Sequence, residues 1–427
     1  MSRKMIALWC LMLIGGFMFL LPQESAAVPA WSRLTGSTCN SCHATPTWQL
    51  TTFGLDFLKN GHRIEAAPAK FDLGVQKWDN YLSLVWKFRA YSEENKNPSS
   101  QFEQHSFSIY SGGALSERFS YFTEMYLSEN TGKTAAGTTG VVQDDAARKK
   151  LAEAFLQYNQ PLGGKNFLAV RAGAILPEHI HVFGAGARSA EQRALVLNDK
   201  GNPANPYKVF TRAQGVDAKL NMGHLEVAAG ILDGAANATN AIDTNNHKDY
   251  YASALLAFDK NESAVGVYHY GGRYSVYATA DDPATALTYN NDFTKDGVLF
   301  RFIRDKWRVV GVYFMGKDDG DAAGTERDNE GYYGLIDYNL TDKLGAYVRY
   351  DMLDDDTDDK ATFSATASGI KETTQIMIGL NGMLYMTEKS GARWNLELTQ
   401  KEVDSVVSSV ASSTKTKRAL LQITWAF

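Results

Sequence analysis

The sequence is poor in cysteine and in long apolar runs, and both shortages narrow the possibilities. It has three cysteines in 427 residues, and Cys10 lies in a segment that we expect to be removed. No run beyond residue 27 is long and apolar enough for a membrane helix, which excludes helical membrane spans. The formal net charge of −5 argues against a nucleic-acid-binding protein.

The first 27 residues read as a secretory signal peptide. Arg3 and Lys4 form a basic start, an apolar run extends from Met5 to Leu21, and Ser25-Ala26-Ala27 suits a cleavage site. We therefore expect residues 1–27 to be removed, so that the mature chain begins at Val28 and works outside the cytoplasm.

Both remaining cysteines belong to one motif, Cys39-Asn40-Ser41-Cys42-His43, which has the C-x-x-C-H spacing of a c-type haem attachment site. Two thiols at this spacing can each bond one vinyl group of a single porphyrin, and His43 can then ligate the iron. The alternatives are a Cys39–Cys42 disulfide, half of a zinc site, or a redox C-x-x-C. A zinc site needs a second Cys or His pair, and a redox motif needs a βαβ context; the sequence shows neither.

A short helix is predicted between Trp48 and Ile64, ending at Asn60-Gly61. His62 follows that stop and is the only other histidine of the segment Val28–Gly74, which we call the haem segment. His62 is a candidate for the distal iron ligand. The alternative is a polar residue at a helix end that interacts with the helix dipole. His224, after a later turn, is a second choice of ligand.

From Val75 to Phe427 the chain consists of short segments of alternating polarity. In one of them Leu344, Ala346, Val348 and Tyr350 alternate with charged or polar residues, which is the period of a β-strand. We count sixteen such segments, starting near residues 76, 104, 118, 151, 166, 209, 223, 249, 262, 295, 307, 330, 343, 372, 390 and 416.

The connections between these segments alternate between short turns and long polar loops. An even strand number with short turns on one side matches a bacterial outer-membrane β-barrel, and the alternating, aromatic C-terminus ending in Phe427 fits such a barrel. The alternative is a soluble β-sandwich, which has no need of charges on nearly every inner face. The predicted fold is thus all-β: a 16-stranded antiparallel barrel with a helical haem segment docked at or in its lumen.

Ten charged residues are expected to face that lumen: Lys87, Arg89, Asp217, Glu226, Arg301, Asp337, Arg349, Arg393, Glu397 and Arg418. The longest loop, Leu176 to Lys208, carries His179 and His181. Such a loop can fold inward and touch a metal or the haem edge, but we favour a solvated loop. Acidic loops near Asp318 and Asp354 could attract divalent cations, or could simply be solvated.

The haem segment resembles the fused cytochrome–porin family of outer-membrane iron(II) oxidases. The matching residues are Pro29, Trp31, Arg33, Thr35-Gly36, Cys39, Cys42-His43, Phe53-Gly54, Phe57 and Lys59-Asn60-Gly61. The order of signal, single motif and barrel also agrees. The sequence departs from the family at His62, where many members have an aromatic residue.

The resemblance implies one covalent haem c that passes electrons from extracellular Fe(II) to a periplasmic c-type cytochrome. It implies three parts: a signal peptide at 1–27, the haem segment at 28–74 and a barrel at 75–427 in the lipid of the bacterial outer membrane, with the haem segment on the periplasmic side or in the lumen. The same architecture could pass electrons outward in extracellular metal reduction. A solute porin with a haem-bearing plug is a third possibility.

Overall fold

The computed structural model describes residues 29–66, 80–129, 150–186, 188–199, 205, 207–234, 245–258, 263–277, 285–319, 326–355, 369–387, 390–407 and 410–427. The predicted signal peptide and the predicted boundary between residues 74 and 75 lie outside these ranges. Within the described residues, no helix is both long and apolar enough to cross a bilayer.

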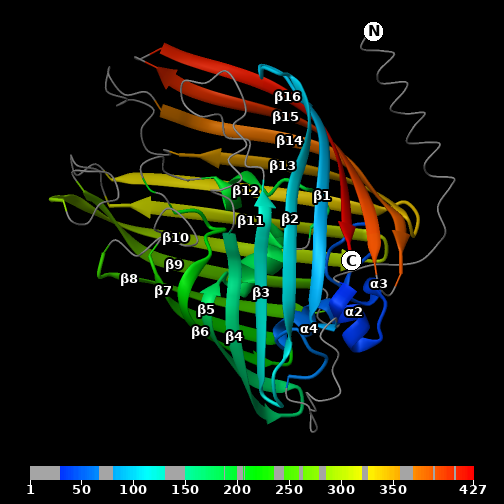
Figure 1. Cartoon of the computed structure of the whole chain (residues 1–427). Coiled ribbons are helices and arrows are strands. Elements are labelled where there is room, and N and C mark those ends of the chain that lie inside the picture. The colour runs from blue at the N-terminus through cyan, green and yellow to red at the C-terminus, as the bar shows by residue number, and fades with distance from the viewer. Residues whose placement is uncertain are drawn as a thin grey trace.

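Sixteen antiparallel strands form a closed barrel, because the first strand pairs with the last (Figure 1). This confirms the predicted fold class. The strands are β1 (Leu82–Glu93), β2 (Ser100–Ala114), β3 (Phe119–Glu129), β4 (Lys150–Gly163), β5 (Asn166–Ile175), β6 (Ala213–Met222), β7 (Leu225–Asp233), β8 (Lys248–Phe258), β9 (Ser263–Tyr277), β10 (Leu287–Arg304), β11 (Trp307–Asp318), β12 (Arg327–Asn339), β13 (Leu344–Asp354), β14 (Gly369–Met386), β15 (Gly391–Val407) and β16 (Val410–Ala426). Strand β10 begins well before the predicted residue 295.

Polarity alternates across the barrel wall as the sequence predicts. On β13, Val348 and Tyr350 are exposed on the outside, whereas Arg349 and Asp351 are buried inside. An apolar exterior around a charged interior suits a barrel in a bilayer and does not suit a soluble sandwich, which hides its apolar face. Closure also pairs every strand edge, which a bilayer requires because it offers no water to unpaired backbone groups.

The two ends of the barrel differ. Short connections such as Asp305-Lys306 lie at one end, which we call the turn end, together with the C-terminus (Figure 1). Asp305 takes a left-handed φ of 52°, which lets the chain reverse in two residues. At the opposite end of the barrel, strands such as β3 and β4 are joined by connections that are longer in sequence.

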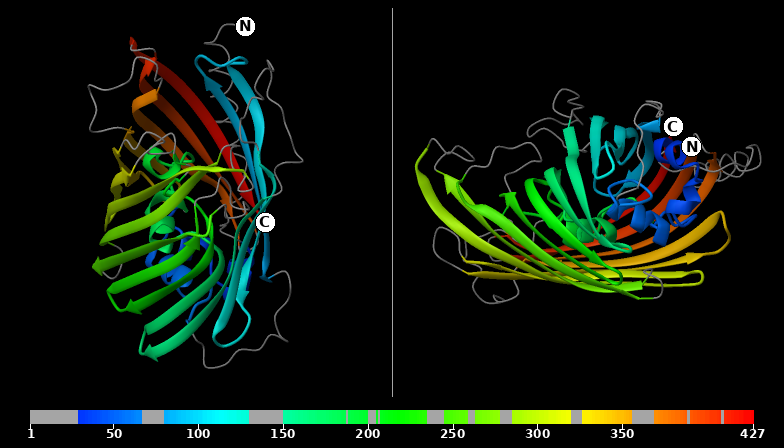
Figure 2. Two further views of the ribbon diagram at one scale, coloured as in Figure 1. Left: turned by 90° about the vertical axis from the view of Figure 1, so that its left-hand side faces the viewer. Right: turned by 90° about the horizontal axis from the view of Figure 1, so that it is seen from below.

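The connection between β5 and β6 folds into the barrel rather than into solvent (Figure 2). It contains α5 (Glu178–Ile180), a turn of π-helix, η4 (His181–Ala185), and α6 (Leu195–Asn198). We call residues 176–212 the inner loop. Its apolar residues are buried against strand residues, as Phe183 and Leu197 show. Our expectation of a solvated loop was therefore wrong, because these side chains bury more apolar surface inside the barrel.

The haem segment forms three short helices, α2 (Pro29–Thr35), α3 (Cys39–Cys42) and α4 (Thr52–Lys59), at the turn end (Figures 1 and 2). Thr51 is the N-cap of helix α4, and its hydroxyl accepts from the Gly54 amide at 3.2 Å. The segment is fastened to the wall by long-range hydrogen bonds, such as Trp31 Nε1 to the Gly112 carbonyl at 3.1 Å. The Gln49 amide also binds Asp337 of β12.

Candidate haem site

The C-x-x-C-H motif forms one helical turn that packs directly on α4. The His43 amide donates to the Cys39 carbonyl at 2.9 Å, and the Thr51 amide donates to the Cys42 carbonyl at 2.9 Å. Gly54 allows the approach, since a Cβ at that position would lie 2.1 Å from the Cys42 carbonyl oxygen. The two helices therefore hold the motif in a fixed position.

His43 has the orientation of a metal ligand. Its Nδ1 bonds to the Trp48 carbonyl at 2.9 Å, and its ring stacks on the Trp48 ring at 4.4 Å. A proton on Nδ1 leaves the Nε2 lone pair available to a metal, which is the usual arrangement for a ligating imidazole. Burial lowers the pKa of His43 to about 4, so the ring is neutral at physiological pH, as ligation requires.

The two cysteines are in different environments. Cys42 lines a large cavity, whereas Cys39 is 1% exposed and its Sγ lies 3.2 Å from the Ser32 hydroxyl. Burial raises the pKa of both thiols to about 12. A redox C-x-x-C works through a lowered thiol pKa, so this environment argues against that alternative.

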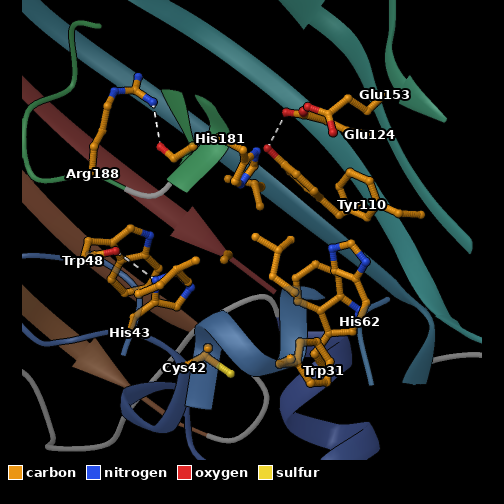
Figure 3. Close-up of a pocket in the computed structure, with 18 of the residues that line it drawn as sticks. Trp31, Cys42, His43, Trp48, His62, Tyr110, Glu124, Glu153, His181 and Arg188 are labelled. Carbon is orange, nitrogen blue, oxygen red and sulfur yellow. Dashed lines mark hydrogen bonds between the residues drawn. The ribbon is translucent and has the colours of Figure 1, made fainter. Parts of the chain in front are cut away.

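His62 lies on the other side of the same cavity (Figure 3). Its ring is 4% exposed and stacks between Trp31 at 4.7 Å and Phe122 of β3 at 4.4 Å. Its Nδ1 is buried and has no hydrogen-bond partner among the described residues. Burial lowers the pKa of His62 to about 3, so a neutral ring gains little from the helix dipole, which favours cations.

The cavity has a volume of about 240 Å³, whereas a single buried water needs only about 10–15 Å³. Its wall beside the haem segment is mostly apolar, with Trp31, Leu50, Phe57 and Leu58. The opposite wall is charged and is built from the strands and the inner loop. An apolar wall beside a charged one suits an amphiphilic group of the kind that haem represents.

Among the described residues, the cavity is lined by six cations: Lys87, Arg171, Arg188, Arg193, Arg212 and Arg393. Four carboxylates line it as well: Glu124, Glu153, Glu178 and Glu191. The cavity wall therefore has a formal excess of two positive charges.

The structure separates the histidines that the sequence grouped as secondary candidates. His224 is exposed in the β6–β7 turn, and His179 is buried with its Nδ1 bonded to Ser253 at 2.9 Å, so neither lines the cavity. His181 of the inner loop does line it. Among the acidic residues, Asp318 is buried and accepts hydrogen bonds from Asn205, Asn291 and Asn329, which is a structural role.

Two residues that shape the site carried no separate signal in the sequence. Trp48, which orients His43, and Phe122, which covers His62, are ordinary aromatic residues in their local segments. Trp48 could have been noticed as an aromatic residue five positions after the motif histidine. Phe122 needed the barrel, because its strand position says only that it faces inward.

The residues present fit a covalent haem. A thiol in the cavity wall, an imidazole oriented through its Nδ1, and a second imidazole, His62, that lines the same cavity are the groups that such a cofactor would use. A thioether at Cys39 would replace the contact of its thiol with Ser32.

No protein-family model matches the chain, and no curated protein matches its sequence. Its fold is similar to that of the outer membrane channel DcaP of Acinetobacter baumannii, with 12% identity, a TM-score of 0.53, and 81% of this chain and 96% of that chain covered. OmpT, an outer membrane protein of Vibrio cholerae, is similar with 11% identity, a TM-score of 0.51, and 81% and 97% covered. Salmonella typhi OmpF, solved in complex with daunomycin, is similar with 10% identity, a TM-score of 0.51, and 81% and 97% covered. Such low identities show the fold alone: a barrel of the outer-membrane porin kind.

Proposed function

We propose that this protein is an outer-membrane electron conduit that accepts electrons from extracellular Fe(II) and passes them, through one c-type haem, to a periplasmic c-type cytochrome. The observation that supports it best is the placement of His43 and His62 on opposite sides of one cavity that Cys42 also lines (Figure 3). When bound, the haem supplies a one-electron Fe(II)/Fe(III) couple.

The chain's own residues have separable parts in this proposal. Cys39 and Cys42 would anchor the porphyrin, and His43 would be the proximal ligand, held in its tautomer by the Trp48 carbonyl. His62 would be the distal ligand, kept neutral by burial and fixed between Trp31 and Phe122. The aromatic cover would also keep water away from the iron, which favours electron transfer over reactions with solvent.

The barrel and the inner loop would both contribute to the proposed electron conduit, but in different ways. The barrel's apolar exterior contacts outer-membrane lipid, which is an insulator for electrons. The inner loop and the haem segment occupy much of the lumen, so ferrous iron and its insoluble oxidation products would stay outside. In the orientation that the proposed function requires, the turn end faces the periplasm and presents the haem segment to its electron acceptor.

The proposal is tested by anaerobic mixing of purified holoprotein with Fe(II) while the absorption bands of reduced haem are followed. We expect reduction in the wild type and a changed rate in His62→Ala, with His181→Ala as the matched control from the same cavity. Wild-type holoprotein that stays oxidised over a range of pH would contradict the proposal. A low midpoint potential would instead favour outward electron flow to extracellular metal.

A solute porin with a haem-bearing plug is the second candidate, and the charged cavity wall favours it. Liposome swelling separates the two. Rapid swelling in sugars or small anions, without electron transfer, would support the porin, whereas the filled lumen leads us to expect slow swelling.

A further inference from the structure

The cavity wall contains more positive charge than its own carboxylates neutralise. Two of the six cations are already paired in full: Arg171 with Asp217, at 2.9 Å from its Nε, and Arg212 with Glu124 and Glu153, at 2.9 and 2.8 Å. The excess therefore lies with the other four cations, around the single carboxylate of Glu191.

The surroundings of Glu191 show how strong this excess is. Burial alone would raise the pKa of Glu191, but Arg393, Lys87 and Arg188 together lower it to about 2. Burial and the neighbouring Arg188 lower the pKa of Arg193 to about 9. The cations around Glu191 therefore carry more positive charge than its one carboxylate neutralises, and an anion in the cavity would interact favourably with them.

Arg393 is the cation best placed to receive that anion. Its side chain is buried, and its Nη2 donates to Glu191 at 2.6 Å, but its Nε and Nη1 have no hydrogen-bond partner among the described residues. Its guanidinium lies 5.1 Å from the centre of the Trp48 ring, which fixes it beside the residue that orients His43. These two N–H groups point to different sides of the buried guanidinium, and either can donate a charge-assisted hydrogen bond to a further carboxylate.

Lys87 of β1 is, after Arg393, the second cation available to an anion in the cavity. Its ammonium group lines the cavity, and it has no ion pair within 4.0 Å in the part of the chain that the structure describes. By contrast, Arg188 donates to the carbonyls of Gly186 and Glu191 at 3.0 and 2.6 Å, and Arg193 lies 3.6 Å over the Phe210 ring. The described cations of the haem segment are also engaged, since Arg33 binds the Leu82 carbonyl and Lys59 binds Glu226.

We propose that Arg393 and Lys87 bind the two propionate carboxylates of the haem. This inference rests on the proposed function, because it takes the haem as the occupant of the cavity. The two propionates would bring negative charge to the part of the cavity where four cations surround one carboxylate. The barrel wall, rather than the haem segment, would therefore neutralise the cofactor and influence its potential.

The test compares Arg393→Gln and Lys87→Gln with Arg89→Gln in full-length holoprotein. Arg89 is a matched control, since it is a buried lumenal cation two residues along β1 that does not line the cavity and that pairs with Gln422 and Glu103. Haem attachment is first verified by intact mass and pyridine haemochrome. The propionate bending bands in resonance Raman and the midpoint potential are then measured.

We expect the propionate bands to shift in Arg393→Gln and Lys87→Gln and to stay unchanged in Arg89→Gln. Removing a cation favours the ferric form, so the equilibrium between ferric and ferrous haem should move about tenfold toward ferric, a drop of about 59 mV for one electron. Arg393→Lys should recover most of the potential but not the original bands, because the ammonium group lacks the planar fork.

Unchanged propionate bands in haem-loaded Arg393→Gln and Lys87→Gln would overturn this inference alone. A shift of the wild-type potential on adding inorganic phosphate would also overturn it, because the cations would then be open to a diffusible anion. Wild-type protein without covalent haem would instead remove the proposed function, and this inference with it.

Discussion

The contact between Lys59 of the haem segment and Glu226 of β7 gives the sharpest test of how the segment is held. The two side chains are 12% and 3% exposed, so the ion pair is buried at the boundary between the segment and the barrel. Lys59→Met keeps the aliphatic stem and its packing but removes the charge. The carboxylate of Glu226 then stays buried without its closest cation.

The expected loss of stability depends on the partners that the Glu226 carboxylate retains in Lys59→Met. His179 Nε2 lies 3.5 Å away, and Lys219 also interacts with the same carboxylate. The loss is therefore one hydrogen bond to a charged group, about 1.5–3 kcal/mol, rather than the 3–5 kcal/mol of a buried charge left without any partner. This corresponds to a roughly ten- to hundredfold higher population of segments detached from the barrel.

Hydrogen exchange of the amides in α4, followed by mass spectrometry on the detergent-solubilised protein, measures that population. We expect α4 to exchange roughly ten to a hundred times faster in Lys59→Met. The control is Lys96→Met, which breaks an exposed pair with Glu93 at 2.9 Å and should cost at most about 1 kcal/mol. Equal exchange of α4 in the two variants would refute the buried ion pair as an anchor of the segment.

Four further predictions concern the haem segment and its cavity. Replacing Cys39 and Cys42 together by Ser should give a chain whose intact mass lacks one haem, and His62→Ala should change the spin state of the ferric haem in electron paramagnetic resonance; retained haem or an unchanged spectrum would contradict the respective assignment. Gly54→Ala should cost about 1–3 kcal/mol in the packing of α3 on α4, because its Cβ meets the Cys42 carbonyl oxygen at 2.1 Å, and an unchanged α4 exchange rate would contradict that contact. In the Cys39→Ser/Cys42→Ser chain, the lowered pKa values of His62 and His43 mean that the detached form binds protons first, so stability is complete well above pH 6.5 and falls by about 2 kcal/mol per ring as the pH drops to 5; α4 exchange with a flat pH dependence, after correction for the intrinsic rate, would refute it.

The number of strands and the direction of their side chains could be predicted from the sequence because both are local properties. Alternation along Leu344–Asp354 needs only the two-residue period of an extended chain, and the structure has Arg349 inward and Val348 outward, as that period requires. For the inner loop, the sequence led us to expect a solvated segment, and this expectation was wrong. Loop composition does not tell whether Phe183 and Leu197 find an apolar surface elsewhere in the chain.

The candidate site likewise has residues that could be predicted from the sequence and residues that could not. The motif histidine and cysteines are recognisable because haem attachment demands a fixed spacing within five residues. The partners of His62 are not, because Trp31 lies in α2 and is separated from it by α3 and α4, while Phe122 comes from a strand on the barrel wall. Arg393 could be predicted only to face inward, and its place beside Trp48 depends on how the segment sits in the lumen.

By itself, the sequence determined a barrel-forming chain with a C-x-x-C-H turn at its front, since strand period and motif spacing are set by neighbouring residues. Only the tertiary structure decided that His43 and His62 share one cavity and that its far wall is cationic. Those relations join residues as far apart as Gln49 and Asp337. They form only when the strands close into a barrel and the inner loop and the haem segment pack inside it.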